Sequence, residues 1–348
     1  MEKIKRIVVP LLLCVSLLLY VAGCGGAPET SGAKSAGNDK VIKWDYIDII
    51  AQDHPAAKIM LDFAEEIKEK TNGRLIITFR APGELPIKTD EYVRAVGENS
   101  VQMANGLLST ISGDLVAGGI PVLPFIVNDD KELKVVMDIL KDDYKKELAQ
   151  YGCDTLFYYS WPFQNLWGQG EPVTDMKQLK GQKFRVQGIE QSIFCDKNAI
   201  VPVSMGAAEV LTSLSRSVIN GVVTAGVNVY GSKYYDALKW GYLTDIQTTT
   251  TIILVNKKAL ADLPDDIRKI VLETSEKYSP IGQRFLLDVE DDLQKQLVEK
   301  HGMVINKASQ EEKDAQMGWA KEYWMQWAQK KGGTAPERLE QVVKTLGK

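Results

Sequence analysis

A helical pattern of apolar residues spans residues 264–302 and limits what this chain can fold into. Its members recur at the spacing of one helix face: Ile267, Ile270, Val271, Tyr278, Ile281, Phe285, Val289, Leu293 and Leu297. At about 1.5 Å per residue such a helix approaches ~55 Å, which is longer than one domain needs. We therefore expect it to bridge two domains, with a kink or a break at Pro280.

Strand and helix patterns alternate along the rest of the chain, which favours α/β layers. Residues 41–46 alternate apolar and polar side chains, and the helical pattern that follows can be capped by Asp53 and ends at Gly73. Further strands are expected at residues 74–80, 155–159, 181–186, 248–256 and 303–305, and further helices at residues 133–148, 207–216 and 310–331. The last helix carries Trp319, Trp324 and Trp327, which we expect to be packing residues.

The first two dozen residues have the layout of an export signal. They comprise a cationic start, an apolar run over residues 7–21 and a small-residue end. Because the run is short and contains Pro10, a permanent membrane span is the weaker interpretation. The chain is therefore expected outside the cytoplasm.

The end of this segment, Val21-Ala22-Gly23-Cys24, is similar to the bacterial lipobox, in which the Cys is lipidated and becomes the new N-terminus. We expect residues 1–23 to be a lipoprotein signal peptide. Residues 24–40 would then be the lipidated Cys24 and a flexible tether rich in Gly, Ala, Ser and Thr. The alternative is an ordinary signal peptide cut near Ala22.

Neither the cysteines nor the charge points to a metal site or to nucleic acid. Beyond Cys14 and Cys24 only Cys153 and Cys195 remain, so there is no disulfide framework and no CxxC pair. Both a bridge between these two and a pair of free, buried thiols stay open. The formal net charge is -4 with scattered Lys and Arg, which is not the footprint of a nucleic-acid-binding protein.

Common signatures of catalysis are also missing. The sequence has no HExxH, GxSxG or P-loop motif, and Gly168-Gln169-Gly170 lacks the third glycine of a dinucleotide fingerprint. The two histidines, His54 and His301, fall near helix ends, where a cap or a solvated side chain is the simpler role. We therefore predict neither an enzyme nor a cofactor.

Residues 175–186 read Asp-Met-Lys-Gln-Leu-Lys-Gly-Gln-Lys-Phe-Arg-Val. This passage resembles the D-x-x-x-L-K-G-x-K-x-R-V signature of the solute-binding subunits of TRAP transporters, the tripartite ATP-independent periplasmic family. The resemblance covers nearly all of the chain from about Val41, because supporting segments lie on both sides of this passage. These segments are Phe63-Ala64-Glu65-Glu66-Ile67, Thr71-Asn72-Gly73-Arg74, Gly83-Glu84-Leu85 and Pro202-Val203-Ser204-Met205.

The resemblance implies an α/β fold of the periplasmic-binding-protein type, a two-domain clamp with chain crossovers and a long helix across both domains. We expect the first domain to comprise residues 41–162 and 251–291, and the second residues 163–250 and 292–348. The resemblance also implies that a ligand is buried in the interdomain cleft and that the protein delivers this ligand to the membrane subunits of a TRAP permease.

Arg185 stands where the family has the arginine that pairs with the ligand carboxylate. A planar guanidinium offers parallel donors to both carboxylate oxygens, and that pairing is strong in a dry cleft. The alternative is a solvated arginine at a strand end. The expected ligand is thus a small organic acid.

Two departures from the family bear on the ligand. Asn165 stands where some members carry a second arginine, and Asn220-Gly221-Val222-Val223-Thr224 replaces the common Asp-Gly-x-Glu-Asn. Asn165, Asn220 and Thr224 are therefore candidate ligand contacts. With a single cationic anchor, we expect a monocarboxylate with an apolar or aromatic body, because a second carboxylate would lack a partner.

Aromatic residues cluster at the expected first crossing between the domains. Tyr159, Trp161 and Phe163 alternate along one extended segment, so one face of it can reach the cleft. Ordinary core packing is an equal alternative for each. Asn105, just after an expected strand, is a further candidate.

Two other functions remain open at this point. A secreted α/β enzyme could use the same cleft. A binding protein for an ATP-driven importer or a sensor kinase would share the architecture and differ in its partner.

Overall fold

A single mixed sheet of nine strands organises the part of the chain that the computed structural model describes, residues 40–116 and 118–348. The strands run in the order β2-β1-β3-β8-β4-β7-β5-β6, and β9 pairs with β8 off this path. Their bounds are β1 Ile42–Ile47, β2 Leu75–Arg80, β3 Met103–Leu107, β4 Cys153–Gly168, β5 Lys183–Val186, β6 Val201–Ser204, β7 Gly221–Thr224, β8 Trp240–Asn256 and β9 Val304–Lys307.

The sheet has two parallel parts joined by two long antiparallel strands. Strands β1, β2 and β3 pair in parallel in what we call the first lobe, and β5, β6 and β7 do so in the second lobe. Strand β3 pairs with one end of β8, whereas β7 pairs with the opposite end of the β4–β8 ladder. Because β4 and β8 run through both lobes, the predicted chain crossovers are confirmed. The domain boundaries given above remain a prediction.

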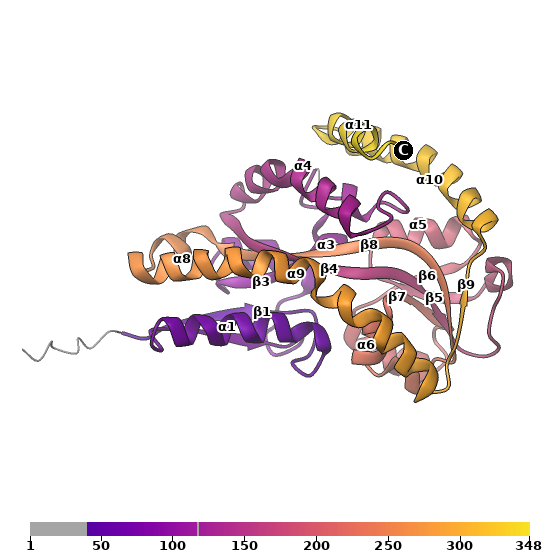
Figure 1. The fold of residues 1–348 in the computed structure, drawn as a ribbon, viewed down its shortest axis with the longest axis horizontal. Helices are drawn as coiled ribbons and strands as arrows, with labels where there is room; N and C mark the ends of the chain where they lie inside the picture. The colour runs from indigo at the N-terminus through magenta and orange to yellow at the C-terminus, as the bar shows by residue number, and fades with distance from the viewer. Residues whose placement is uncertain (1–39, 117) are drawn as a thin grey trace, which may run out of the picture. The chain divides into compact units, whose positions relative to one another are not determined.

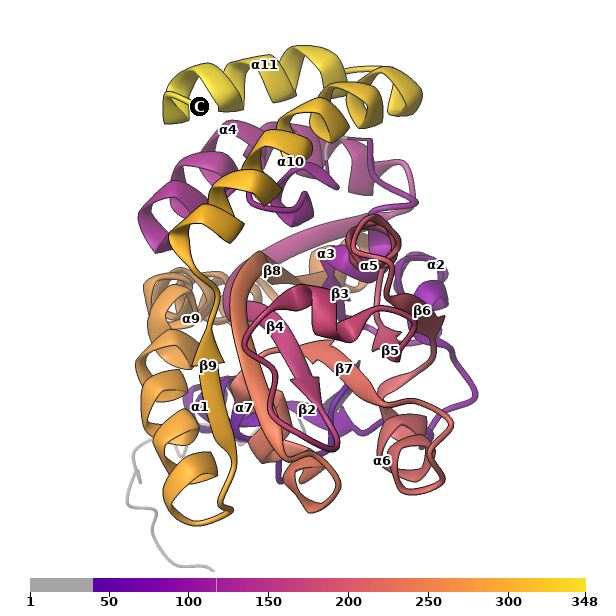
Figure 2. The same cartoon turned by 90° about the vertical axis from the view of Figure 1, so that its right-hand side faces the viewer.

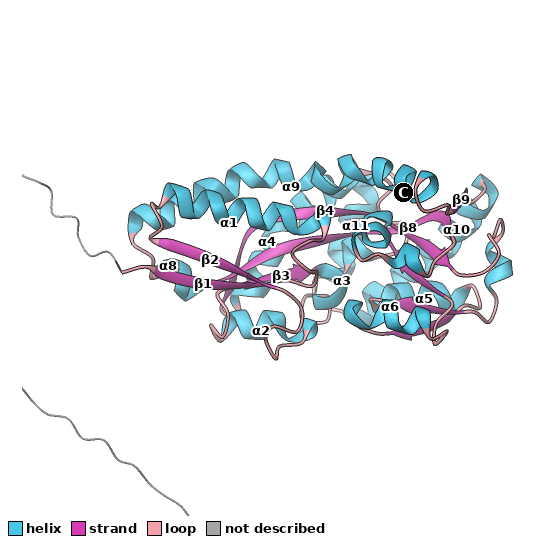
Figure 3. Ribbon diagram, turned by 90° about the horizontal axis from the view of Figure 1, so that it is seen from below, coloured by secondary structure: helices cyan, strands magenta, loops and turns pink. Residues whose placement is uncertain are grey.

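The long helix predicted from the sequence is α9 (Asp265–Glu299). It runs along β4 and lies beside α1 (Lys58–Lys70) of the first lobe (Figures 1 and 3). It also contacts α7 (Gly226–Gly231) of the second lobe (Figure 2). Asp265 and Asp266 in its first turn complement the helix dipole. The helix continues through Pro280, so the expected break is absent.

Helices also cover the opposite side of the long strands. Helix α4 (Asp130–Ala149), capped by the Asp129 side chain, packs against β4, and Figure 2 shows α10 (Gln310–Lys331) and α11 (Ala335–Leu346) beside it. The remaining helices are short: α2 Tyr92–Gly97, α3 Leu108–Ile111, α5 Ile189–Lys197, α6 Ala207–Ser215 and α8 Lys257–Ala261, with 3-10 turns at Pro55–Ala57, Thr89–Glu91, Ile120–Val122, Met176–Leu179 and Tyr234–Asp236.

The C-terminal helices connect the two lobes a further time. Glu312 near the start of α10 accepts a hydrogen bond from Met176 of the second lobe at 3.0 Å. Farther along, the Trp324 indole donates to the Pro124 carbonyl at 2.8 Å, and Arg338 of α11 pairs with Asp143 of α4 at 2.5 Å. The packing role predicted for Trp324 is confirmed, since its side chain is buried.

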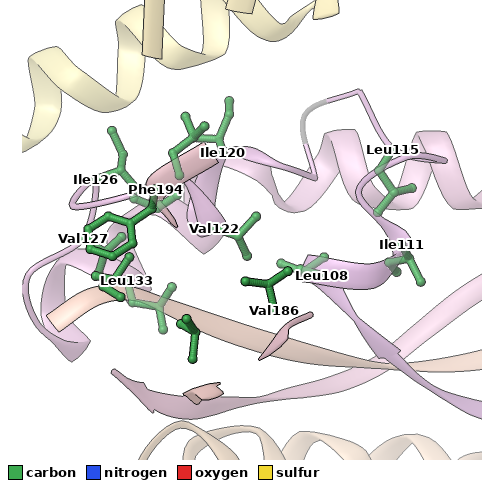
Figure 4. Close-up of a cluster of buried hydrophobic side chains, with 14 of the residues drawn as sticks. Leu108, Ile111, Leu115, Ile120, Val122, Ile126, Val127, Leu133, Val186 and Phe194 are labelled. Atoms are coloured by element: carbon green, nitrogen blue, oxygen red, sulfur yellow. The ribbon is translucent and has the colours of Figure 1, made fainter. Parts of the chain in front are cut away.

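One apolar cluster draws on both lobes. Figure 4 shows side chains from α3, the segment after it and α4 together with Val186 of β5 and Phe194 of α5. Buried apolar area is the main source of stability, so this shared core holds the lobes together in the state seen here.

Several local expectations need correction. Strands β4 and β8 are far longer than the five- and nine-residue segments expected from the sequence. The residue that caps the first helical segment is His54 and not Asp53, since the His54 Nδ1 accepts a hydrogen bond from the Ala56 amide at 3.1 Å. Cys153 and Cys195 are free and buried, so no bridge joins them.

Some expectations cannot be placed on the fold. The signal peptide, Cys24 and the tether lie outside the described residues. Among the residues described, no helix is long and apolar enough to cross a bilayer. The same part of the chain holds no group of three or more potential metal ligands.

Candidate functional site

A pocket between the lobes gathers side chains from both of them. Its empty space is about 430 Å³ when the part open to solvent is counted, and its closed cavity volume is about 30 Å³. The first lobe contributes the apolar residues Ile49, Ile50 and Leu107, and the long strands contribute Trp161, Gln164 and Thr249. The second lobe contributes the rest of the lining: Arg185, Gln187, Ala207, Thr224, Asn228, Ser232 and Tyr234.

Arg185 is the single basic residue in this lining. It lies in β5 between Val203 of β6 and Val222 of β7, and only 4% of its surface is exposed. Its Nε donates to the Met205 carbonyl at 3.0 Å, and no described carboxylate forms an ion pair with it. Burial lowers the pKa of Arg185, but a guanidinium stays protonated in proteins. The pocket therefore contains a buried cation without a counter-ion.

Trp161 lies in β4 and lines the pocket, but the predicted alternation of aromatic residues does not continue beyond it. The pairing of β4 with β8 shifts register between Trp161 and Gln164, where Pro162 cannot donate a ladder hydrogen bond. Gln164 consequently reaches the pocket, and Phe163 is absent from the lining. A bulge of this kind reverses side-chain direction, which is why sequence alternation missed Gln164.

Threonines supply polar groups on two sides of the pocket. Thr224, at the end of β7, accepts a hydrogen bond from the Asn228 side chain at 2.9 Å. The hydroxyl of Thr249 is buried and has no hydrogen-bond partner in the described protein. Since buried polar groups are normally satisfied, this hydroxyl is available to a ligand.

Asn165 and Asn220 lie away from the pocket. The Oδ1 of Asn165 accepts hydrogen bonds from the Thr244 and Asp245 amides at 2.8 and 2.7 Å, and its Nδ2 donates to the Phe163 carbonyl at 3.2 Å. Asn220 accepts from the Lys183 amide at 2.8 Å and borders an open hollow on the second lobe. Both side chains are thus occupied by backbone groups.

Tyr159 and Asn105 are buried near Trp161 without lining the pocket. The Asn105 Nδ2 donates to the Tyr159 hydroxyl at 2.9 Å, and the Tyr159 ring lies 5.8 Å from that of Trp161, centroid to centroid. Neither residue has a free surface toward a ligand, since both are 0% exposed.

His54 forms a contact across the lobes. Its ring tilts against Trp161, with 6.2 Å between the centroids, and it sits against Gly231 of α7. A Cβ on Gly231 would come within 2.4 Å of the His54 Cδ2. Burial lowers the pKa of His54 to about 4, and the nearby Asn228 and Asp53 oppose that shift.

Sequence reasoning did not identify Gln187, Asn228, Ser232 or Tyr234. All four lie in the loop after β5 or around α7, near the ends of parallel strands where open α/β sheets commonly bind ligands. Their shared position at strand ends is the signal by which they can be found.

Comparison with known proteins identifies the fold and the family. Residues 48–331 match the family model DctP, described as bacterial extracellular solute-binding protein, family 7. A solute-binding protein of Sulfitobacter sp. (strain NAS-14.1) is 26% identical over 67% of this chain and 71% of its own length.

Two solved structures share the architecture. A Bordetella pertussis extracytoplasmic solute receptor that binds pyroglutamic acid has a TM-score of 0.81 at 21% identity, covering 87% of this chain and 100% of the receptor. A TRAP periplasmic solute-binding protein of Shewanella oneidensis with bound succinate has a TM-score of 0.78 at 18% identity, covering 87% of this chain and 99% of its own.

Proposed function

Because the chain belongs to family 7 of the bacterial extracellular solute-binding proteins, we propose that it captures a small organic acid in the pocket between its lobes. It hands that acid to the membrane subunits of a TRAP permease and performs no chemistry on it. Cys24 holds the protein to the membrane through a lipid, on the side away from the cytoplasm.

The observation that supports this proposal most is the state of Arg185. A buried charge without a partner is costly, so a site that keeps one is suited to a ligand of opposite charge. The guanidinium retains donors that no described residue engages, and a carboxylate matches them in two parallel hydrogen bonds.

The same lining favours a monocarboxylate. Arg185 is its single cation, and Asn165, at the position of the second family arginine, is bonded to backbone outside the pocket. Trp161, Ile50 and Leu107 provide apolar surface for the body of the ligand, as pockets with few fixed polar groups do.

A thermal-shift screen tests the ligand class. A ligand that binds only the folded state stabilises it by about 2.7 kcal/mol at a hundredfold excess over Kd. We expect shifts with pyroglutamate and phenylacetate that exceed those with succinate and glucuronate. A shift with succinate alone would exclude the monocarboxylate assignment, and a shift with glucuronate alone would exclude the apolar body of the ligand. Either result would leave solute capture intact.

Mass spectrometry first identifies the ligand that co-purifies with the protein, and it then separates binding from catalysis. A ligand added to the purified protein should be recovered chemically unchanged after prolonged incubation. Its conversion, absent in an Arg185→Ala variant, would instead support an enzyme that uses the same pocket.

A further inference from the structure

Asp48 is a fully buried carboxylate directly after β1, and it lies next to the pocket without lining it. No described lysine or arginine pairs with it. It is held instead by donors: Oδ2 accepts from the Tyr46 hydroxyl at 2.6 Å, and Oδ1 accepts from the Ile49 amide at 2.6 Å and from the Asn105 Nδ2 at 2.8 Å. A buried charge of this kind is retained only where such bonds replace its hydration.

One of these donors belongs to the pocket wall itself. The Ile49 amide fixes the start of the segment whose side chains, Ile49 and Ile50, line the pocket. The Tyr92 hydroxyl also donates to the Asp48 carbonyl at 2.9 Å, which holds the Asp48 backbone from α2.

A second route leads from Asp48 to the aromatic wall. The Trp161 indole donates to the Thr251 hydroxyl at 3.0 Å, and that hydroxyl donates to the Asn105 Oδ1 at 3.0 Å. Asn105 then donates to Asp48. The Trp161 N–H is therefore connected to the carboxylate by three consecutive hydrogen bonds.

The carboxylate sets the direction of this chain. An ionised carboxylate only accepts hydrogen bonds, so the Asn105 amide must turn its nitrogen toward Asp48 and its oxygen toward Thr251. Thr251 must then donate to Asn105, which leaves its lone pairs for the Trp161 indole. With a neutral group at position 48, both orientations of the Asn105 amide become possible.

We propose that Asp48 is a positioning residue whose carboxylate, through Ile49 and through Asn105 and Thr251, fixes the first-lobe wall and the Trp161 indole before a ligand enters. Its effect on affinity rests on the proposed function, whereas its effect on Trp161 does not. Preorganisation of a wall raises affinity because less ordering remains to be done on binding.

The test follows the Trp161 indole N–H in the ligand-free full chain, labelled with ¹⁵N at tryptophan and assigned with Trp161→Phe. In Asp48→Asn we expect hydrogen exchange at Trp161 to become at least tenfold faster. Trp324, whose indole donates to the Pro124 carbonyl at 2.8 Å in another part of the molecule, is the internal control and should keep its rate.

Two further variants separate positioning from stability. Thr251→Val cuts the chain between Asn105 and Trp161 at nearly constant volume and should free the Trp161 indole as Asp48→Asn does. Leu297→Ala, in α9, lowers stability within a cluster that contains neither Trp161 nor Trp324 and should leave the ratio of the Trp161 and Trp324 rates unchanged. Unchanged Trp161 exchange in both Asp48→Asn and Thr251→Val would overturn the proposal.

Calorimetry with pyroglutamate and phenylacetate then measures the consequence for binding. Asp48→Asn and Thr251→Val should each weaken affinity about ten- to hundredfold. The loss of binding free energy in the double variant should be smaller than the sum of the losses in the two single variants. If Trp161 is freed while affinity stays at the wild-type level, the positioning role is wrong. If the wild-type protein binds no organic acid, the proposed function fails, and the exchange rates still decide the role of Asp48.

Discussion

At the scale of single residues, we expect ligand binding to depend most on Arg185. Loss of one partner of a buried, hydrogen-bonded pair costs about 3–5 kcal/mol, which corresponds to a loss of affinity of about a hundredfold to a few thousandfold. We expect Arg185→Ala to nearly abolish binding in calorimetry, and Arg185→Lys to restore little because an ammonium lacks the bidentate geometry. Arg94→Ala is the control: this arginine is exposed, pairs with Glu91 and should leave affinity unchanged. Near-normal affinity in a folded Arg185→Ala protein would show that another group binds the carboxylate.

Asp48 and His54 make opposite contributions to the pH dependence of stability. Burial raises the pKa of Asp48 from 3.8 to about 6, so the stability linked to it is lost as pH rises through that range. Burial lowers the pKa of His54 from 6.5 to about 4, so the stability linked to it is lost as pH falls through that range. Between pH 4 and 6 the two slopes oppose each other in the wild-type protein.

Single substitutions should therefore reveal each slope. Urea unfolding between pH 4 and 6 measures both slopes. In Asp48→Asn, the free energy of unfolding should rise more steeply with pH than in the wild type. In His54→Asn, which keeps a capping side chain, the free energy of unfolding should rise less steeply with pH or fall. Each change is at most about 1.4 kcal/mol per pH unit for one proton. Slopes that change in the same direction in both variants would contradict this assignment.

At the scale of elements, the contact between His54 and α7 requires a glycine. Because a Cβ at position 231 would meet the His54 ring, Gly231→Ala should force the two lobes apart at this point. Overpacking of this kind costs about 1–3 kcal/mol, which corresponds to a loss of affinity of up to about a hundredfold. Gly113→Ala is the matched control, since its Cβ would meet nothing within 4 Å. Equal affinities of the two variants, measured by calorimetry, would show that the contact does not limit binding.

The sequence predicted elements well where one local pattern decides them. The apolar stripe of α9 and the bounds of α10 follow from helical periodicity, and Arg185 follows from a contiguous motif. Strand β4 was underestimated because Pro162 interrupts its apolar pattern, and β8 because Gly241 and Asp245 interrupt the pattern before Thr248. In the folded chain, the pairing of β4 with β8 extends both strands.

The pocket was predicted less completely for a physical reason. Gln164 reaches the pocket through a bulge, and Asn228 reaches it on a short helix from a distant segment. Asp48, next to the pocket, belongs to a hydrogen-bond network that forms only in the folded chain. The placement of Asn165 outside the pocket lining was not predictable, because its polar side chain binds backbone amides of β8 that begin 79 residues later in the sequence. No local pattern contains this information.

At the scale of the whole molecule, the proposed anchor determines where the protein acts. If Cys24 carries lipid, intact-mass analysis should show a mature chain that begins at a modified Cys24 and fractionates with membranes. Two acyl chains give stable attachment where a single chain is marginal. Cys24→Ala should release the protein into the soluble fraction, whereas Cys195→Ala, a change at a buried free thiol, should leave it on the membrane. An unmodified, soluble wild-type protein would refute the anchor.

The long strands have a consequence for engineering new specificities. In the described residues, four elements pass from one lobe to the other: β4, β8, α9 and α10. A lobe is therefore not a contiguous cassette, and grafting the second lobe of a relative would require a splice within each of these elements. Recombination between members is thus confined to whole chains, and new ligands are best sought by point substitutions in the pocket wall.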